Sequence, residues 1–337
     1  MGKFERGEAE KLEKDVVKIL NNQQVPNSHP CASNLANRIR EDFQNQIINA
    51  EFIGRNYNEP CNIKLNLNNN RIAYIELKLL RIGKGTRANL SQNALTNFNL
   101  FSGENIKSWS SFREENNFDN EVLRILNSYE HYDENKLQSY RENNEKIKKA
   151  RYLKDIIKPN KGESIERAIE RLRNNQDVRI RRACEVVSQI LTLAKKDKLE
   201  YINYLRTLNQ NPEFIKKFSI LILLGFHKES AIRQGFENFD SIIQSIGQNY
   251  IYKTYYVNRL NCEMRCEDLT NLINELLNSC FRISFPENET NCLIEYRPNN
   301  QNEWRKLLRI VFHWKNVFQG IKTPCLNIFD EFQIYRH

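Results

Sequence analysis

The segment from Asn58 to Leu80, NEPCNIKLNLNNNRIAYIELKLL, contains residues with the types and spacing of a metal-dependent hydrolytic site. Glu76 and Lys78 are separated by one residue, so on a β-strand both side chains point to the same side. Hydrolysis of a phosphodiester with a divalent ion needs carboxylates that hold the metal and a cationic or basic group beside the attacking water. Glu76 and Lys78 are candidates for these two roles.

The residues around this pair predict a β-hairpin that would position it. Apolar residues at every second position predict one strand over residues 63–67. After the Asn-rich turn at 68–70, a second strand is expected over residues 71–80. With this turn as the loop, Asn62 falls opposite Glu76 on the polar face. The hairpin is therefore expected to bring both residues together with the lysine of the pair.

This pattern resembles the PD-(D/E)xK nuclease superfamily, whose core is a helix, a hairpin with Asp on its first strand and (D/E)xK on its second, then a helix and further strands. Residues 76–78, Glu-Leu-Lys, match the ExK motif, and Asn62 stands where the family's Asp is expected. The first helix of the family sometimes supplies a glutamate, for which Glu41 is the candidate here. The resemblance covers roughly residues 33–101 and 178–226 and implies a Mg²⁺-dependent nuclease. An ExK motif alone is common, because many exposed amphipathic strands contain one.

Asparagine at position 62 departs from the family pattern. An amide oxygen can coordinate a hard cation but brings no charge, so metal affinity and water activation should both be lower than with aspartate. Three explanations are open: Glu59 supplies the carboxylate, asparagine is the natural residue, or the chain is an engineered form in which asparagine replaces aspartate so that bound DNA stays uncut. The register of residue 62 and the restraint of Pro60 on Glu59 favour the third. The expected metal ligands are Glu76, Asn62 and Glu59.

The other patterns predict a mixed α/β (α+β) fold, with a restriction-endonuclease-like core in which helices flank a central mixed sheet. The charged, helix-prone stretch 102–177 predicts a mostly helical insertion. Residues 1–230 would form the nuclease core, and residues 231–337 a C-terminal α+β region that packs on the core and recognises DNA. Other expected elements are helices at 8–21, at 33–48 with Ser33 as N-cap, at 90–101 and from 178 to about 209 in two pieces, and a buried central strand at 219–226, SILILLGF.

Charge favours a polyanionic partner. The net charge is +9 and the pI is near 9.0, and counterion release favours binding of a basic protein to a phosphate backbone. A Gly-rich turn after the ExK strand can approach a phosphate closely, and Lys and amide side chains can read base edges. Candidate DNA contacts are Lys84 and Arg87 in that turn, Arg179, and Lys315, Asn316, Gln319 and Lys322 near the C-terminus. Each of these could also be a solvated surface residue.

Cysteine usage and hydropathy predict a soluble cytoplasmic protein with reduced thiols. Eight cysteines occur without a CxxC pair, no signal-peptide pattern is present, and the longest apolar run, 218–226, is too short for a membrane helix. Neither a Walker loop nor a dinucleotide fingerprint is present, so no nucleotide cofactor is expected. Four cysteines are expected to be buried structural thiols rather than zinc ligands: Cys262, Cys266, Cys280 and Cys292.

Together these features predict a site-specific endonuclease for double-stranded DNA, similar to type II enzymes of restriction–modification systems, with Mg²⁺ as cofactor. The expected catalytic residues are Asn62, Glu76, Lys78 and Glu41. The preference for a restriction enzyme rests on a stand-alone chain without a motor motif. A homodimer is expected, because two-fold dimers commonly cut palindromic sites. The alternatives are a non-catalytic DNA-binding protein that keeps the nuclease scaffold, and a basic helical interaction protein without a nucleic-acid role.

Overall fold

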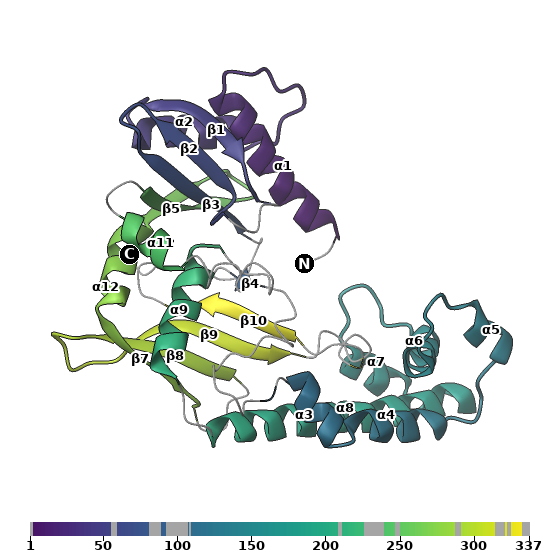
Figure 1. Ribbon diagram of the computed structural model, residues 1–337. Helices are drawn as coiled ribbons and strands as arrows, with labels where there is room; N and C mark the ends of the chain where they lie inside the picture. Colours follow the sequence, from purple (N-terminus) through teal and green to yellow (C-terminus); the bar gives the residue numbers. More distant parts are fainter. Residues whose placement is uncertain are drawn as a thin grey trace.

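The arrangement of the chain is known from a computed structural model (Figure 1). Within the ranges that it describes, no helix is long and apolar enough to cross a membrane. The described residues are 3–54, 59–80, 89–91, 107, 109–207, 211–225, 239–246, 250–286, 291–313, 321 and 325–331.

One five-stranded mixed sheet carries the predicted hairpin. Its strand order is β1 (Ile47–Phe52), β2 (Ile63–Leu67), β3 (Ile72–Leu80), β5 (Tyr250–Asn258) and β6 (Met264–Asp268). Strands β3 and β5 are parallel and the other neighbours are antiparallel. The strands of this sheet therefore come from both sides of residue 230, the predicted boundary between the nuclease core and the C-terminal region.

Both faces of this sheet are covered, because alternate residues of its central strands enter two different apolar clusters. Helices α1 (Lys3–Leu20) and α2 (Ala32–Asp42) pack on the face that carries Ile63 and Ile75. Tyr74 of β3 points to the opposite face, into a cluster shared with the later helices. Those helices are α9 (Pro212–Leu223), α11 (Phe239–Ser245) and α12 (Leu269–Leu277).

A second five-stranded sheet packs against the same later helices. It is antiparallel throughout, in the order β4 (Asn89–Ser91), β10 (Cys325–Asp330), β9 (Arg305–His313), β8 (Asn291–Pro298) and β7 (Ser279–Ser284). Its buried face, with Phe281, Ile294 and Phe312, belongs to the cluster that also contains Tyr74. The two sheets thus share one core.

A helical lobe extends from this core (Figure 1). It contains α3 (Trp109–Glu115), α4 (Phe118–Asn127), α5 (Glu134–Ser139), α6 (Glu145–Ile157), α7 (Ile165–Leu172) and α8 (Val178–Arg206). The first half of α8 packs in the lobe through Val187 and Ile190, and its last turns reach the shared core through Ile202 and Leu205. The predicted mixed α/β fold is confirmed, and the described part of residues 102–177 is mostly helical. That this stretch is an insertion into a restriction-endonuclease-like core remains a prediction.

The predicted buried strand at 219–226 is wrong, because residues 212–223 form α9. The Asn211 side chain accepts the N–H of Phe214 at 3.1 Å, and Pro212 occupies the first turn, so both residues favour a helix start. The run is apolar on all sides because the helix lies buried within the shared core.

The predicted helix at 33–48 is too long and its N-cap is wrong. Cys31, not Ser33, precedes the helix, and α2 ends at Asp42. Gln44 and Asn45 then adopt positive φ angles of 49° and 57°, which a helix does not permit, and β1 follows.

Three further predicted helices differ from the structure. The predicted pair from 178 to about 209 is one continuous helix, α8. The predicted helix at 90–101 overlaps strand β4, and its residues 92–101 lie outside the described residues.

Candidate functional site

The β2–β3 hairpin has the predicted register. Ile63 pairs with Ile75 and Leu65 with Ala73, which places residue 62 opposite Glu76. The backbone N–H of Asn62 donates to the carbonyl of Ile75 at 3.0 Å. Positions 62, 76 and 78 therefore meet at one end of the hairpin.

Glu76 is a buried carboxylate with one free oxygen. Only 2 % of the residue is exposed. Its Oε1 accepts a hydrogen bond from Nζ of Lys78, whereas its Oε2 has no hydrogen-bond partner in the part of the chain that the structure describes. Buried polar atoms normally have partners, so this oxygen indicates a position for a ligand.

A second carboxylate, Glu13 of α1, lies within electrostatic reach of this pair. Burial, and after it the negative charge of Glu76, raise the pKa of Glu13 to about 8, while Lys78 acts in the opposite direction. Glu13 follows Leu12 and precedes Val16 on the buried side of the helix. A carboxylate on this apolar face was the sequence signal that could have identified it.

Glu41, the predicted helix carboxylate, occupies a different environment. It is exposed on α2, whose buried face carries Leu35, Ala36 and Ile39. The structure therefore favours Glu13 over Glu41 as the helix-derived carboxylate of the site.

Asn62 holds the two strands together at the site. Its Oδ1 accepts the backbone N–H of Leu77 at 3.2 Å, between the positions of Glu76 and Lys78. Because a carbonyl oxygen has two lone pairs, Oδ1 keeps one that could face a cation.

Glu59 has partners of its own. Its Oε1 lies 3.1 Å from Nζ of Lys64, and its Oε2 accepts the hydroxyl of Tyr74 at 2.5 Å. These two contacts engage both carboxylate oxygens. They argue against Glu59 as a substitute for the missing aspartate.

The end of α9 closes the site on one side. The N–H of Cys61 donates to the carbonyl of Leu224 at 2.8 Å. Gly225 follows with φ +89°, and a Cβ at this position would lie 2.9 Å from Oε2 of Glu76. Burial and the charge of Glu76 raise the pKa of the Cys61 thiol well above its usual value, so it stays protonated rather than acting as a nucleophile.

These donors suit a hard divalent cation. Mg²⁺ keeps several of its waters and often takes only one or two carboxylates from a protein, which Glu76 and Glu13 can supply beside the amide of Asn62. Among the described residues no group of three or more His, Cys, Asp or Glu side chains is placed to hold a metal. The free oxygen of Glu76 is the observation that fits the ion.

Of the predicted DNA contacts, Arg179 lies within the described residues. Arg179 is exposed near the start of α8 and pairs with Asp177 at 2.9 Å, in the helical lobe. Six other candidates lie outside the described residues: Lys84, Arg87, Lys315, Asn316, Gln319 and Lys322.

Comparison of the chain with models of known protein families, with curated proteins and with solved structures gave no match. The function is therefore inferred from the geometry of the site.

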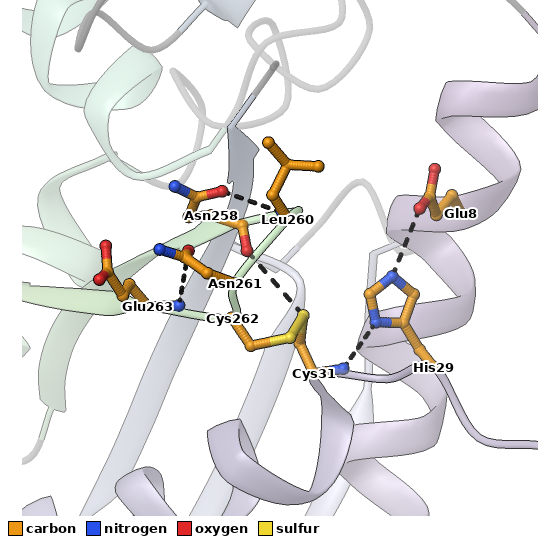
Figure 2. The surroundings of a disulfide bond; sticks show 8 residues. All are labelled: Glu8, His29, Cys31, Asn258, Leu260, Asn261, Cys262 and Glu263. Atoms are coloured by element: carbon orange, nitrogen blue, oxygen red, sulfur yellow. Dashed lines mark hydrogen bonds and ion pairs between the residues drawn. A yellow bond between two sulfur atoms is a disulfide. The ribbon is translucent and has the colours of Figure 1, made fainter. Parts of the chain in front are cut away.

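The cysteines differ from the prediction. Cys31 and Cys262 form a disulfide, so the prediction that all thiols are reduced is wrong for this pair (Figure 2). Cys292 is buried as predicted, Cys266 is half-buried and Cys280 is exposed. Cys280 lies on β7, where its side chain points away from the core because its neighbour Phe281 points into it.

Proposed function

We propose that the chain is a Mg²⁺-dependent endonuclease that cuts double-stranded DNA at specific sites, as type II restriction enzymes do. The observation that carries this proposal is the buried carboxylate of Glu76, bound to Lys78 through one oxygen, free at the other, and opposite residue 62. The order of helix, hairpin, later helix α9 and parallel strand β5 also resembles the superfamily core.

The residues of the site have different roles in the proposed reaction. Glu76 and Glu13 would hold the cation, and Asn62 would contribute a neutral oxygen. Lys78, held by Glu76, orients the attacking water and balances negative charge that develops on the phosphate. When bound, the metal supplies a Lewis acid for the phosphate and lowers the pKa of a coordinated water.

Asparagine at position 62 favours one alternative, a DNA-binding protein that keeps a nuclease scaffold without cutting. The amide gives the strands a hydrogen bond but gives the site no charge, and both oxygens of Glu59 are engaged elsewhere. This alternative predicts salt-sensitive DNA binding and no cutting, even after an Asn62→Asp change.

Incubation with a mixed-sequence plasmid and Mg²⁺ tests the proposal, with the present chain, an Asn62→Asp variant and an Asn62→Asp/Glu76→Gln variant run in parallel. Discrete fragments are expected from Asn62→Asp, fewer or none from the present chain, and none from the double variant. Absence of discrete cleavage by all three proteins, with DNA binding retained, would establish the non-catalytic alternative.

The partner and assembly follow from the same proposal. The substrate is double-stranded DNA, the working form is a homodimer, and the compartment is the cytoplasm. Sedimentation that gives a monomer with and without DNA would contradict the dimer.

A further inference from the structure

The Cys31–Cys262 disulfide joins distant parts of the chain at one edge of the first sheet. Cys31 immediately precedes α2, and Cys262 lies in the β5–β6 turn, 231 residues away in the sequence. Cys31 is fully buried, whereas Cys262 is partly exposed. A reductant can therefore reach the bond from the side of Cys262.

Residues next to both cysteines of the disulfide contact Glu8 of α1, and Figure 2 shows the contact on the Cys31 side, through His29. On the Cys31 side, Nδ1 of the buried His29 accepts the N–H of Cys31 at 3.2 Å, and its Nε2 lies 3.6 Å from Glu8. On the Cys262 side, Arg259 of the β5–β6 turn lies 2.5 Å from Glu8. Glu8 is thus held from two directions.

The segment that contains His29 and Cys31 also contacts α1 at a second point. The backbone N–H of His29 donates to the buried Asp15 at 2.8 Å. Glu8 and Asp15 lie on either side of Glu13 in the helix, so the contacts at both positions fix the part of α1 that carries Glu13.

The β5–β6 turn is a firm anchor for these contacts. The Asn258 and Asn261 side chains accept the N–H groups of Leu260 and Glu263 at 2.9 and 3.2 Å, and the N–H of Cys262 donates to the Asn258 carbonyl at 2.9 Å. The turn therefore has its own hydrogen bonds, and the disulfide joins it to the start of α2.

We propose that the Cys31–Cys262 disulfide is a redox-controlled clamp on α1 that holds Glu13 within electrostatic reach of Glu76. Its effect on catalysis rests on the proposed nuclease function, whereas its effect on α1 does not. Reduction by a dithiol begins when a thiolate attacks Sγ of Cys262 and Cys31 leaves as a thiolate that takes up a proton. The second thiol of the reductant then releases Cys262, so two protein thiols form and the dithiol becomes a disulfide.

Among the described free cysteines, all except the exposed Cys280 are poor partners for exchange with this bond. Cys266, on the adjacent strand β6, has its pKa raised to about 11 by burial, so almost none of it is thiolate at neutral pH. Three other free cysteines are buried: Cys61, Cys184 and Cys292. In a reducing cytoplasm the clamp would open, and oxidation would close it.

The test compares oxidised protein, dithiothreitol-reduced protein and a Cys31→Ser/Cys262→Ser variant, with Cys280→Ser as the control for loss of an exposed thiol. Hydrogen exchange of the peptide covering residues 3–20 should be faster in the reduced protein and the double variant, with α8 unchanged. Mn²⁺ affinity, measured by electron paramagnetic resonance on folded protein, should fall about tenfold in the reduced protein and in the double variant, because Glu13 would no longer be held in place. Reoxidation should restore the wild-type protein but not the variant.

Unchanged exchange in α1 after reduction would overturn the clamp whatever the protein does to DNA. Faster exchange with unchanged Mn²⁺ affinity would overturn the positioning of Glu13. If no form binds Mn²⁺, the positioning of a metal ligand is refuted as well. Faster exchange in α1 after reduction would then leave the clamp standing and count against the proposed function, whereas unchanged exchange would overturn the clamp itself.

Discussion

Glu13 of α1 and Glu76 of β3 lie close enough for the charge of Glu76 to raise the pKa of Glu13. Two carboxylates in a buried site oppose each other's ionisation, and a divalent cation relieves this repulsion. The pair therefore links the acidity, the stability and the metal affinity of the site.

The raised pKa of Glu13 predicts a loss of stability with rising pH in metal-free protein. Its folded-state pKa, about 8, lies above the usual 4.5, so the contribution of neutral Glu13 is complete below pH 4.5 and disappears as the pH rises through 8. Each unit by which the folded-state pKa exceeds the unfolded one changes the free energy of unfolding by about 1.4 kcal/mol. Glu13→Gln should therefore gain stability over the wild type towards pH 8, as measured by urea unfolding in EDTA. The same pH profile in both proteins would contradict the burial of Glu13.

Glu13 and Glu41 provide a matched pair for metal binding. Glu13→Gln should weaken Mn²⁺ binding by at least about tenfold, because it removes a carboxylate from the site. Glu41→Gln changes an exposed glutamate and should leave the affinity unchanged. Isothermal titration calorimetry measures the Mn²⁺ affinity of both variants. Weaker binding by Glu41→Gln with unchanged binding by Glu13→Gln would identify Glu41 as the helix carboxylate of the site.

Lys78 should separate cutting from binding. Lys78→Ala in the Asn62→Asp background should slow cleavage by about 100-fold or more, because it removes the group that orients the water. Binding of DNA in the presence of Ca²⁺ should change little. An equal loss in cleavage and binding would make Lys78 a phosphate contact instead.

Gly225→Ala should disturb the site through one added methyl group. The new Cβ would lie 2.9 Å from Oε2 of Glu76 and 3.1 Å from the Cys61 backbone, at a φ of +89°. Gly162→Ala is the control, because Gly162 has φ +84° but no atom within 4 Å of the added Cβ. Both should lose about 1 kcal/mol or more of stability, since alanine disfavours positive φ. Only Gly225→Ala should also lose Mn²⁺ affinity.

The hairpin and its register were predictable because strand alternation and the Asn-rich turn are local features. Ile63 and Ile75 face each other in the structure as the pattern indicates. The helices of residues 102–177 were predictable from local features too, and three of them, together with α8, begin after residues whose side chains cap them: Asp133, Asn144, Ser164 and Asp177.

The missed features depend on contacts between distant segments. The second half of α9 is a buried run within the shared core, and a short buried helical segment cannot be distinguished from a buried strand by periodicity. Pairing of Cys31 with Cys262 requires α2 to lie beside the β5–β6 turn, and no local pattern encodes that contact. Glu13 belongs to a helix that matches no motif. Its position on the apolar face of that helix was the sequence signal, and its burial in the fold identifies it.

The position of a divalent cation tests the proposed site most directly. Crystals of the Asn62→Asp protein soaked in Mn²⁺ and measured at the manganese absorption edge should show one strong anomalous peak, bonded to Oε2 of Glu76 and within reach of Glu13 and residue 62. The peak should be absent from Asn62→Asp/Glu76→Gln crystals treated in the same way. A lack of any peak at Glu76, or a peak that persists without its carboxylate, would contradict the metal site and with it the proposed hydrolysis.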